Sequence, residues 1–125
     1  MLAHARAAGS LRDADSVHEA LLLRERLGST AVGKGVAVPN ARALAVFDSR
    51  WILARSERGI DWNCPDGLPV HLVLLVLSPP ELPVLAHVES VAAAMTLTRL
   101  ARARTRLLEA RDAEEMATII RQALP

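Results

Sequence analysis

The chain has 125 residues, a length that suits one domain, and with 51% hydrophobic and 23% charged residues its composition is that of a globular protein. The formal net charge of +1 excludes a strong electrostatic attraction to nucleic acid or to acidic membranes. The single cysteine, Cys64, excludes a disulfide framework and a multi-cysteine zinc site. We expect neither a metal nor a cofactor.

No segment has the length of a membrane span. The longest apolar stretch, residues 70–77, is interrupted by His71 and is far too short to cross a bilayer. The first ten residues, MLAHARAAGS, lack the continuous apolar core of a signal peptide. These features predict a cytoplasmic protein without membrane insertion.

The first third of the chain predicts helices. Residues 1–9 are typical of a short alanine-rich helical stub ended by Gly9. A second helix is expected over about residues 16–27, with Asp13 or Asp15 as its N-cap and Gly28 at its C-terminal end.

The middle of the chain changes to strand periodicity and turn residues. A short strand is expected at residues 36–38, stopped by Pro39, and a hairpin at 44–47 and 51–54 around the turn 48–50. A run of leucine and β-branched residues over 69–77 predicts a strand that is buried on both faces.

The remainder, residues 82–124, is predicted to be helical. Apolar residues at helical spacing indicate a helix over about 82–100, and a shorter one follows near 105–110. Asp112 and Glu115 have the spacing of a capping box for the last helix. The order of elements predicts one α/β domain over residues 1–125, in which a mixed sheet is covered by helices.

One loop, residues 28–42, carries a possible chemical signal. It combines three glycines with Ser29 and Thr30 and continues into a strand, and such loops bring backbone N–H groups close to phosphate. Its spacing matches neither the P-loop nor the dinucleotide fingerprint. From the residues alone, a tight connection that needs positive φ angles remains the simpler alternative.

The same segment resembles a known family. The pattern runs from Arg24-Glu25 through Gly28-Ser29-Thr30 to the stretch 32–39 that ends at Pro39, and further matches follow at 59–62, 66–70 and 78–79. It resembles the IIA domains of the bacterial phosphotransferase system (PTS), in the fructose/mannitol class with its nitrogen-regulatory branch. The resemblance covers about residues 10–125.

The resemblance implies a mixed sheet with helices on both faces, and a domain that accepts a phosphoryl group from the phosphocarrier HPr and passes it on, or signals by its phosphorylation state. In the family, the acceptor is a histidine directly after the proline of the motif, a position that is Asn40 here. A second histidine and an arginine lie nearby, and these positions correspond to His87 and Arg24. Together with Arg24, Ser29 and Thr30 are the expected anion-binding residues.

Asn40 determines the functional hypothesis. The lone pair of a carboxamide nitrogen is delocalised into the carbonyl group, so Asn40 cannot act as a nucleophile. We therefore expect a regulatory or protein-binding domain whose partner is an HPr-like phosphocarrier, a transporter or a regulator. The alternative is an active phosphocarrier that uses His87, in sugar uptake or in nitrogen-related regulation.

Two further expectations concern surfaces. Family members usually begin with a strand and a longer helix, so the stub at 1–9 predicts an N-terminally shortened domain with an exposed sheet edge. That edge is expected to pair with a second copy, with a partner chain or with an upstream segment. An arginine stripe at Arg99, Arg102 and Arg106 is the only feature that favours nucleic acid, and nearby glutamates make a solvated helix face the better interpretation.

Overall fold

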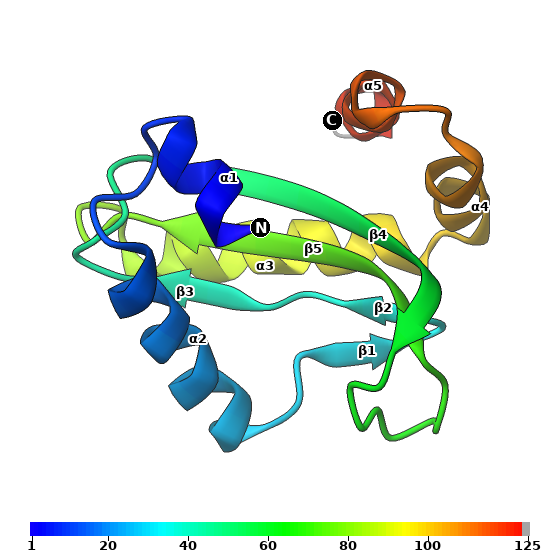
Figure 1. Ribbon diagram of the computed structural model, residues 1–125, viewed down its shortest axis with the longest axis horizontal. Coiled ribbons are helices and arrows are strands. Elements are labelled where there is room, and N and C mark those ends of the chain that lie inside the picture. Colours follow the sequence, from blue (N-terminus) through cyan, green and yellow to red (C-terminus); the bar gives the residue numbers. More distant parts are fainter. Residues whose placement is uncertain (124–125) are drawn as a thin grey trace.

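Strand β5 (Val70–Ser78) is the centre of a five-stranded sheet in the computed structural model, which describes residues 1–123. Its residues are buried except for the half-buried His71, as the apolar run predicts. Two short strands, β2 (Val36–Ala37) and β3 (Asn40–Arg42), pair with it in parallel along one edge. The long strand β4 (Arg50–Ile60) pairs antiparallel along the other edge (Figure 1).

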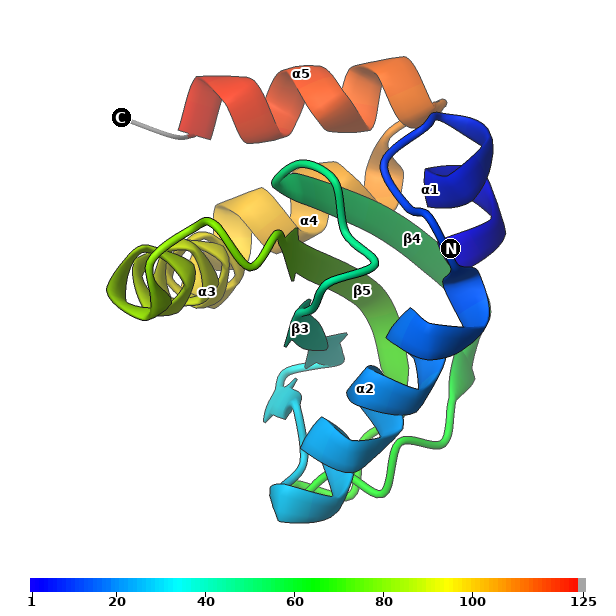
Figure 2. The ribbon, with the colours of Figure 1, turned by 90° about the vertical axis from the view of Figure 1, so that its left-hand side faces the viewer.

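A short strand and five helices complete the fold. Strand β1 (Ala31–Gly33) pairs antiparallel with β2 at the margin of the sheet. Figure 2 shows helices on both faces of the sheet, which confirms the predicted α/β class. The helices are α1 (Leu2–Ala7), α2 (Ala14–Leu27), α3 (Val84–Arg99), α4 (Ala101–Glu109) and α5 (Ala113–Ala123).

The side chains of β5 alternate between two cores. Leu74 and Val76 belong to a cluster that includes Leu97 of α3 and Leu107 of α4. Leu75 and Leu77 belong to a second cluster with residues of α1 and α2. Because successive strand residues point to opposite faces, this single strand anchors both helical layers.

The predicted hairpin at residues 44–47 and 51–54 is wrong. Residues 44–45 form a turn, with a hydrogen bond from Val46 N to Ala43 O at 3.0 Å, and Val46 makes only an isolated antiparallel bridge to Leu11. The real hairpin joins β4 to β5. Val46 is 2% exposed because the turn packs it against the core, so this short apolar run is buried without forming a strand.

The predicted helix ends are largely confirmed. Asp13 is the N-cap of α2 and accepts a hydrogen bond from Asp15 N at 3.0 Å. At α5, Asp112 accepts from Glu115 N at 2.8 Å, but Glu115 accepts from Arg111 N and not from Asp112 N. This is a capping box in which the hydrogen bond to the Glu115 side chain comes from the residue before the N-cap and not from the N-cap itself. Helix α4 begins four residues earlier than expected, at Ala101.

Strand β4 has one open edge among the described residues, because β5 is its only strand partner. On the side of β5 opposite to β4, Leu72 N donates to Gly35 O and Val76 N donates to Pro39 O. The β5 residues that alternate with these two therefore direct their backbone N–H and C=O groups toward β4. The pairing register then directs the backbone groups of Trp51 and Leu53 away from β5.

Candidate functional site

Asn40 lies at the start of β3, next to a break in the strand. Pro39 separates β2 from β3 and still contributes its carbonyl, which accepts from Val76 N at 2.9 Å. Asn40 pairs with Val76, and its side chain points inward, so that the residue is only 8% exposed. Its amide Nδ2 donates to Val38 O at 3.1 Å.

His87 lies in the first turn of α3 and meets Asn40 in the interior. Its Nε2 is 3.3 Å from Asn40 Oδ1, and its Nδ1 is 2.6 Å from Ser78 Oγ at the end of β5. Ser78 is 1% exposed and His87 is 9% exposed. Three elements, β3, β5 and α3, thus place an amide, an imidazole and a hydroxyl in one buried row.

Arg42 fixes the loop between β5 and α3. Its Nε donates to Leu82 O at 2.8 Å and its guanidinium donates to Pro80 O at 2.6 Å. Burial, and after it the positive charge of Arg42, hold the pKa of the His87 imidazole below its usual value. His87 is therefore neutral near pH 7.

Arg24, Ser29 and Thr30 form a second group at the C-terminal end of α2 and the following loop. Arg24 donates to Gly28 O at 2.9 Å, and Ser29 Oγ accepts from Ala31 N at 3.1 Å. Within residues 1–123, no hydrogen bond joins these three side chains to Asn40 or His87. The backbone connects the two groups, since Val38 N donates to Thr30 O at 2.9 Å and Val38 O accepts from Asn40.

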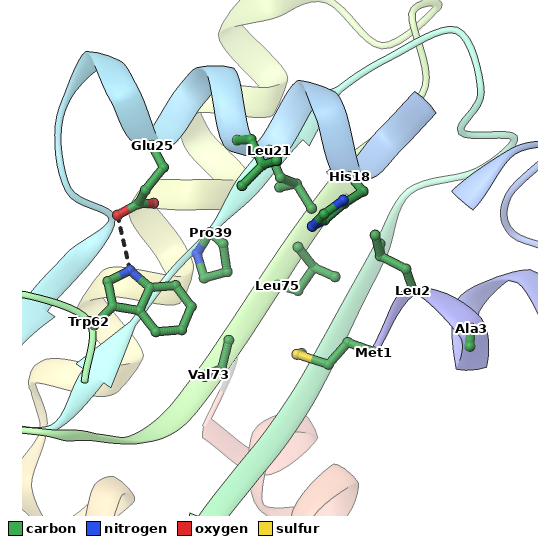
Figure 3. Close-up of a pocket in the computed structure, with 11 residues that line it drawn as sticks. Met1, Leu2, Ala3, His18, Leu21, Glu25, Pro39, Trp62, Val73 and Leu75 are labelled. Carbon is green, nitrogen blue, oxygen red and sulfur yellow. Dashed lines mark hydrogen bonds between the residues drawn. The ribbon is translucent and has the colours of Figure 1, made fainter. Parts of the chain in front are cut away.

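Glu25 organises this second group. Its carboxylate accepts from Thr30 N at 2.9 Å and from Thr30 Oγ1 at 2.5 Å. It also accepts from Trp62 Nε1 at 3.0 Å, the hydrogen bond that Figure 3 shows. Burial raises the pKa of Glu25, but these hydrogen bonds, with one from Ser29, outweigh it and leave the pKa below its usual value. Glu25 is therefore ionised, and the N–H and the hydroxyl of Thr30 both donate to its carboxylate.

A groove of about 500 Å³ lies beside this group, between α2 and the sheet (Figure 3). Its walls are mostly apolar, and Glu25 and Trp62 close one end of it. Pro39 reaches the groove, whereas Asn40 and His87 do not line it. This apolar groove and the buried amide–imidazole pair are thus separate features, connected through the chain at Pro39.

Three residues of these groups were not predicted: Ser78, Arg42 and Glu25. Ser78 belongs to the matched stretch 78–79 without a predicted role, although a hydroxyl at the end of a buried strand needs a hydrogen-bond partner. Arg42 belongs to the loop 28–42, also without a predicted role. Glu25 belongs to the Arg24-Glu25 pair of the motif without a role of its own, and its bond to Trp62 spans 37 positions that the sequence does not connect.

Among residues 1–123, no helix is both long and apolar enough to pass through a membrane. No group of three or more His, Cys, Asp or Glu side chains among residues 1–123 is arranged to hold a metal ion.

Comparison with known proteins identifies the family. The model of the family "Phosphoenolpyruvate-dependent sugar phosphotransferase system, EIIA 2" matches residues 1–123. The chain belongs to this family.

Three similar proteins illustrate its range. The fructose-specific EIIABC component of Bacillus subtilis is 35% identical over 92% of this chain, which spans only 18% of that relative's length. The nitrogen regulatory protein IIA-Ntr of Neisseria meningitidis superposes with a TM-score of 0.79 at 31% identity, over 86% of this chain and 73% of the other. The mannitol IIA of Escherichia coli, solved in a complex with phosphorylated IIB, shares the fold at a TM-score of 0.75 and 16% identity, over 97% and 82% of the two chains.

The lowered pKa of His87 makes a prediction about stability. Above the unfolded-state pKa of about 6.5, both states are neutral at this residue. As the pH falls through that value toward the folded-state pKa, the unfolded chain binds a proton that the folded chain does not, so the free energy of unfolding decreases. We expect His87→Gln to reduce this decrease in urea unfolding measured between about pH 7.5 and pH 5.5.

The matched control is His18→Gln, which changes an exposed histidine of α2 and should leave the wild-type dependence intact. An equally steep decrease in the His87→Gln variant would contradict the assignment to His87.

Proposed function

We propose that this domain is a regulatory, protein-binding member of the EIIA 2 family that does not itself carry a phosphoryl group. The observation that carries the proposal is the side chain directly after Pro39, which is the carboxamide of Asn40. Phosphoryl transfer needs an acceptor with an available lone pair, however well the group is positioned. The amide nitrogen of Asn40 offers none and already donates to Val38 O.

His87 is a poor substitute acceptor. Both of its ring nitrogens have hydrogen-bond partners, and the residue is 9% exposed. Attack on phosphorus requires an accessible lone pair in line with the bond that breaks. The geometry therefore favours the binding role over the alternative, an active phosphocarrier in a fructose/mannitol-type or nitrogen-regulatory system.

The surface around this pair supports protein binding. Large apolar side chains are exposed next to His87 on α3: Val84 at 61%, Leu85 at 68% and Val88 at 53%. Leu44, 85% exposed, follows Arg42, whose guanidinium binds the turn before α3. Such a group of exposed apolar residues is typical of an interaction site.

The partner we propose is a protein of the same system, either an HPr-like phosphocarrier or a transporter or regulator that it controls, in the cytoplasm. A mannitol IIA bound to phosphorylated IIB is a precedent for such an assembly in this fold. The anion-binding role of Arg24, Ser29 and Thr30 remains a secondary part of the proposal, because Arg24 is bound to Gly28 O and Thr30 to Glu25.

We also propose that the open edge of β4 supports self-association. Unpaired backbone groups on an edge strand favour pairing with another chain. The free groups of Trp51 and Leu53 are the contact points that we expect.

Labelling tests the central proposal. Incubated with enzyme I, HPr and phosphoenolpyruvate that is labelled in its phosphoryl group, the wild-type protein should stay unlabelled, because neither Asn40 nor His87 offers an accessible nucleophilic nitrogen at the site. Asn40→His should gain acid-labile label, since an imidazole supplies the missing lone pair while Arg42 and the loop are unchanged. Label on His87 of the wild-type protein would overturn the proposal and select the phosphocarrier alternative.

Substitutions on the apolar surface test docking. We expect Leu85→Asp to weaken binding of HPr by about tenfold or more, measured by NMR titration, because it places a charge in the centre of the contact. Leu27→Asp on α2, at a residue 86% exposed, is the matched control and should leave binding unchanged. Equal affinity in both variants would remove this surface from the proposal.

Sedimentation tests the edge. The wild-type protein should show a concentration-dependent rise in mean mass in sedimentation equilibrium, because edge pairing is an association reaction. A single monomer mass up to about millimolar concentration, where even weak association of about −4 kcal/mol is detectable, would contradict self-association.

A further inference from the structure

The buried pair belongs to a chain of four hydrogen-bonding groups. In order, they are the carbonyl of Val38, the amide of Asn40, the imidazole of His87 and the hydroxyl of Ser78. Each of the four residues is at most 9% exposed. Among the described residues, no buried side-chain nitrogen or oxygen lacks a hydrogen-bond partner.

One backbone carbonyl fixes the direction of this chain. Val38 O can only accept, so the Asn40 atom that faces it at 3.1 Å must be the donor Nδ2. The other amide atom, Oδ1, then faces His87, and an oxygen can only accept there. The proton between the two side chains therefore belongs to His87 Nε2.

The proton position at Nε2 also determines the hydrogen bond at the other ring nitrogen of His87, Nδ1. A neutral imidazole carries one proton, so a ring with N–H at Nε2 has a lone pair at Nδ1. Ser78 Oγ lies 2.6 Å from Nδ1 and must donate its hydroxyl hydrogen to it. At 3.3 Å the bond between Nε2 and Asn40 is long, so the short bond to Ser78 is the stronger restraint on the ring.

We propose that Ser78 is the positioning residue of this site: Asn40 Oδ1 selects the Nε2–H tautomer of His87, and the short bond from the Ser78 hydroxyl to Nδ1 holds the ring where its N–H is directed at residue 40. This inference deepens the proposed function and rests on it for its meaning: an imidazole held in this way offers position 40 a hydrogen-bond donor and no nucleophilic lone pair. Such a ring can hydrogen-bond an oxygen brought to position 40, including a phosphoryl oxygen, but cannot attack phosphorus.

His71 is an internal reference for the test. Its Nδ1 lies 2.8 Å from the carbonyl of Ser56, which can only accept, so His71 is expected as the opposite, Nδ1–H, tautomer. The two histidines of the sheet region should therefore give opposite patterns in one spectrum.

Ring nitrogen NMR of the ¹⁵N-labelled protein at about pH 8, where neutral imidazole dominates, reads both tautomers directly. We expect His87 of the wild-type protein as a single Nε2–H form and His71 as Nδ1–H. In Ser78→Ala nothing holds Nδ1, so the ring should move out of its long contact with Asn40 for part of the time, and a second tautomer of His87 should appear at about a tenth or more of the population. Ser78→Thr retains a hydroxyl and should restore the single form.

Ser90→Ala is the matched control, because it removes a different hydroxyl that accepts from a ring, Trp51 Nε1, at 2.8 Å. It should leave the His87 signals unchanged. A wild-type His87 in the Nδ1–H form would overturn the proposal, and so would a Ser78→Ala spectrum identical to that of wild type. If Ser78→Ala does not fold, the wild-type tautomer and the Ser78→Thr spectrum decide. The labelling experiment does not depend on these spectra, so either proposal can fail alone.

Discussion

The burial of β5 on both faces is the constraint on which the rest of the structure depends. A strand that is buried on both faces can satisfy its backbone groups only through neighbours on both edges, and β2, β3 and β4 supply them. Its two faces in turn require the two helical layers. The candidate site lies where this apolar requirement ends, at Ser78, the one residue of β5 whose hydroxyl finds a polar partner.

Pro39 connects the buried strand β5 to the hydrogen bonds of the site. It interrupts the strand that runs along β5, and the carbonyl of Val38 is then available to the side chain of Asn40. Because that carbonyl cannot donate, it orients the amide, and the amide orients the imidazole of His87. The proton arrangement of the site therefore originates in the backbone carbonyl of Val38, is passed on by the amide of Asn40, and is maintained by the short bond from Ser78 to His87.

The sequence predicts the parts of this structure that repeat a local pattern. The strand at 70–77 and the helices follow from apolar spacing, and the Asp13 cap follows from residue type. The hairpin predicted at 44–47 and 51–54 was wrong because a short apolar run before turn residues also fits a turn that packs against the core at Val46. Local pattern does not distinguish the two cases.

The site itself was predicted only in part. Asn40 and His87 were named through the family resemblance, since their 47-residue separation leaves no trace in spacing. Ser78, Arg42 and Glu25 were missed because each acts through a partner on another segment of the chain: His87 for Ser78, Leu82 for Arg42 and Trp62 for Glu25. Propensity and periodicity describe what a residue does to its own segment, whereas these roles arise when two segments meet.

An amide at position 40 is compatible with a stable domain for a specific reason. A buried polar side chain is costly when one of its groups lacks a partner, and Asn40 has a partner for both Nδ2 and Oδ1. The surrounding scaffold therefore needs no phosphoryl group and no ligand to complete its hydrogen bonds. The exposed apolar residues beside it, among them Leu85, gain nothing from the interior, and they form the surface that we propose for contact with another protein. The buried row therefore maintains the shape of the site, whereas the proposed contact uses the exposed residues beside it.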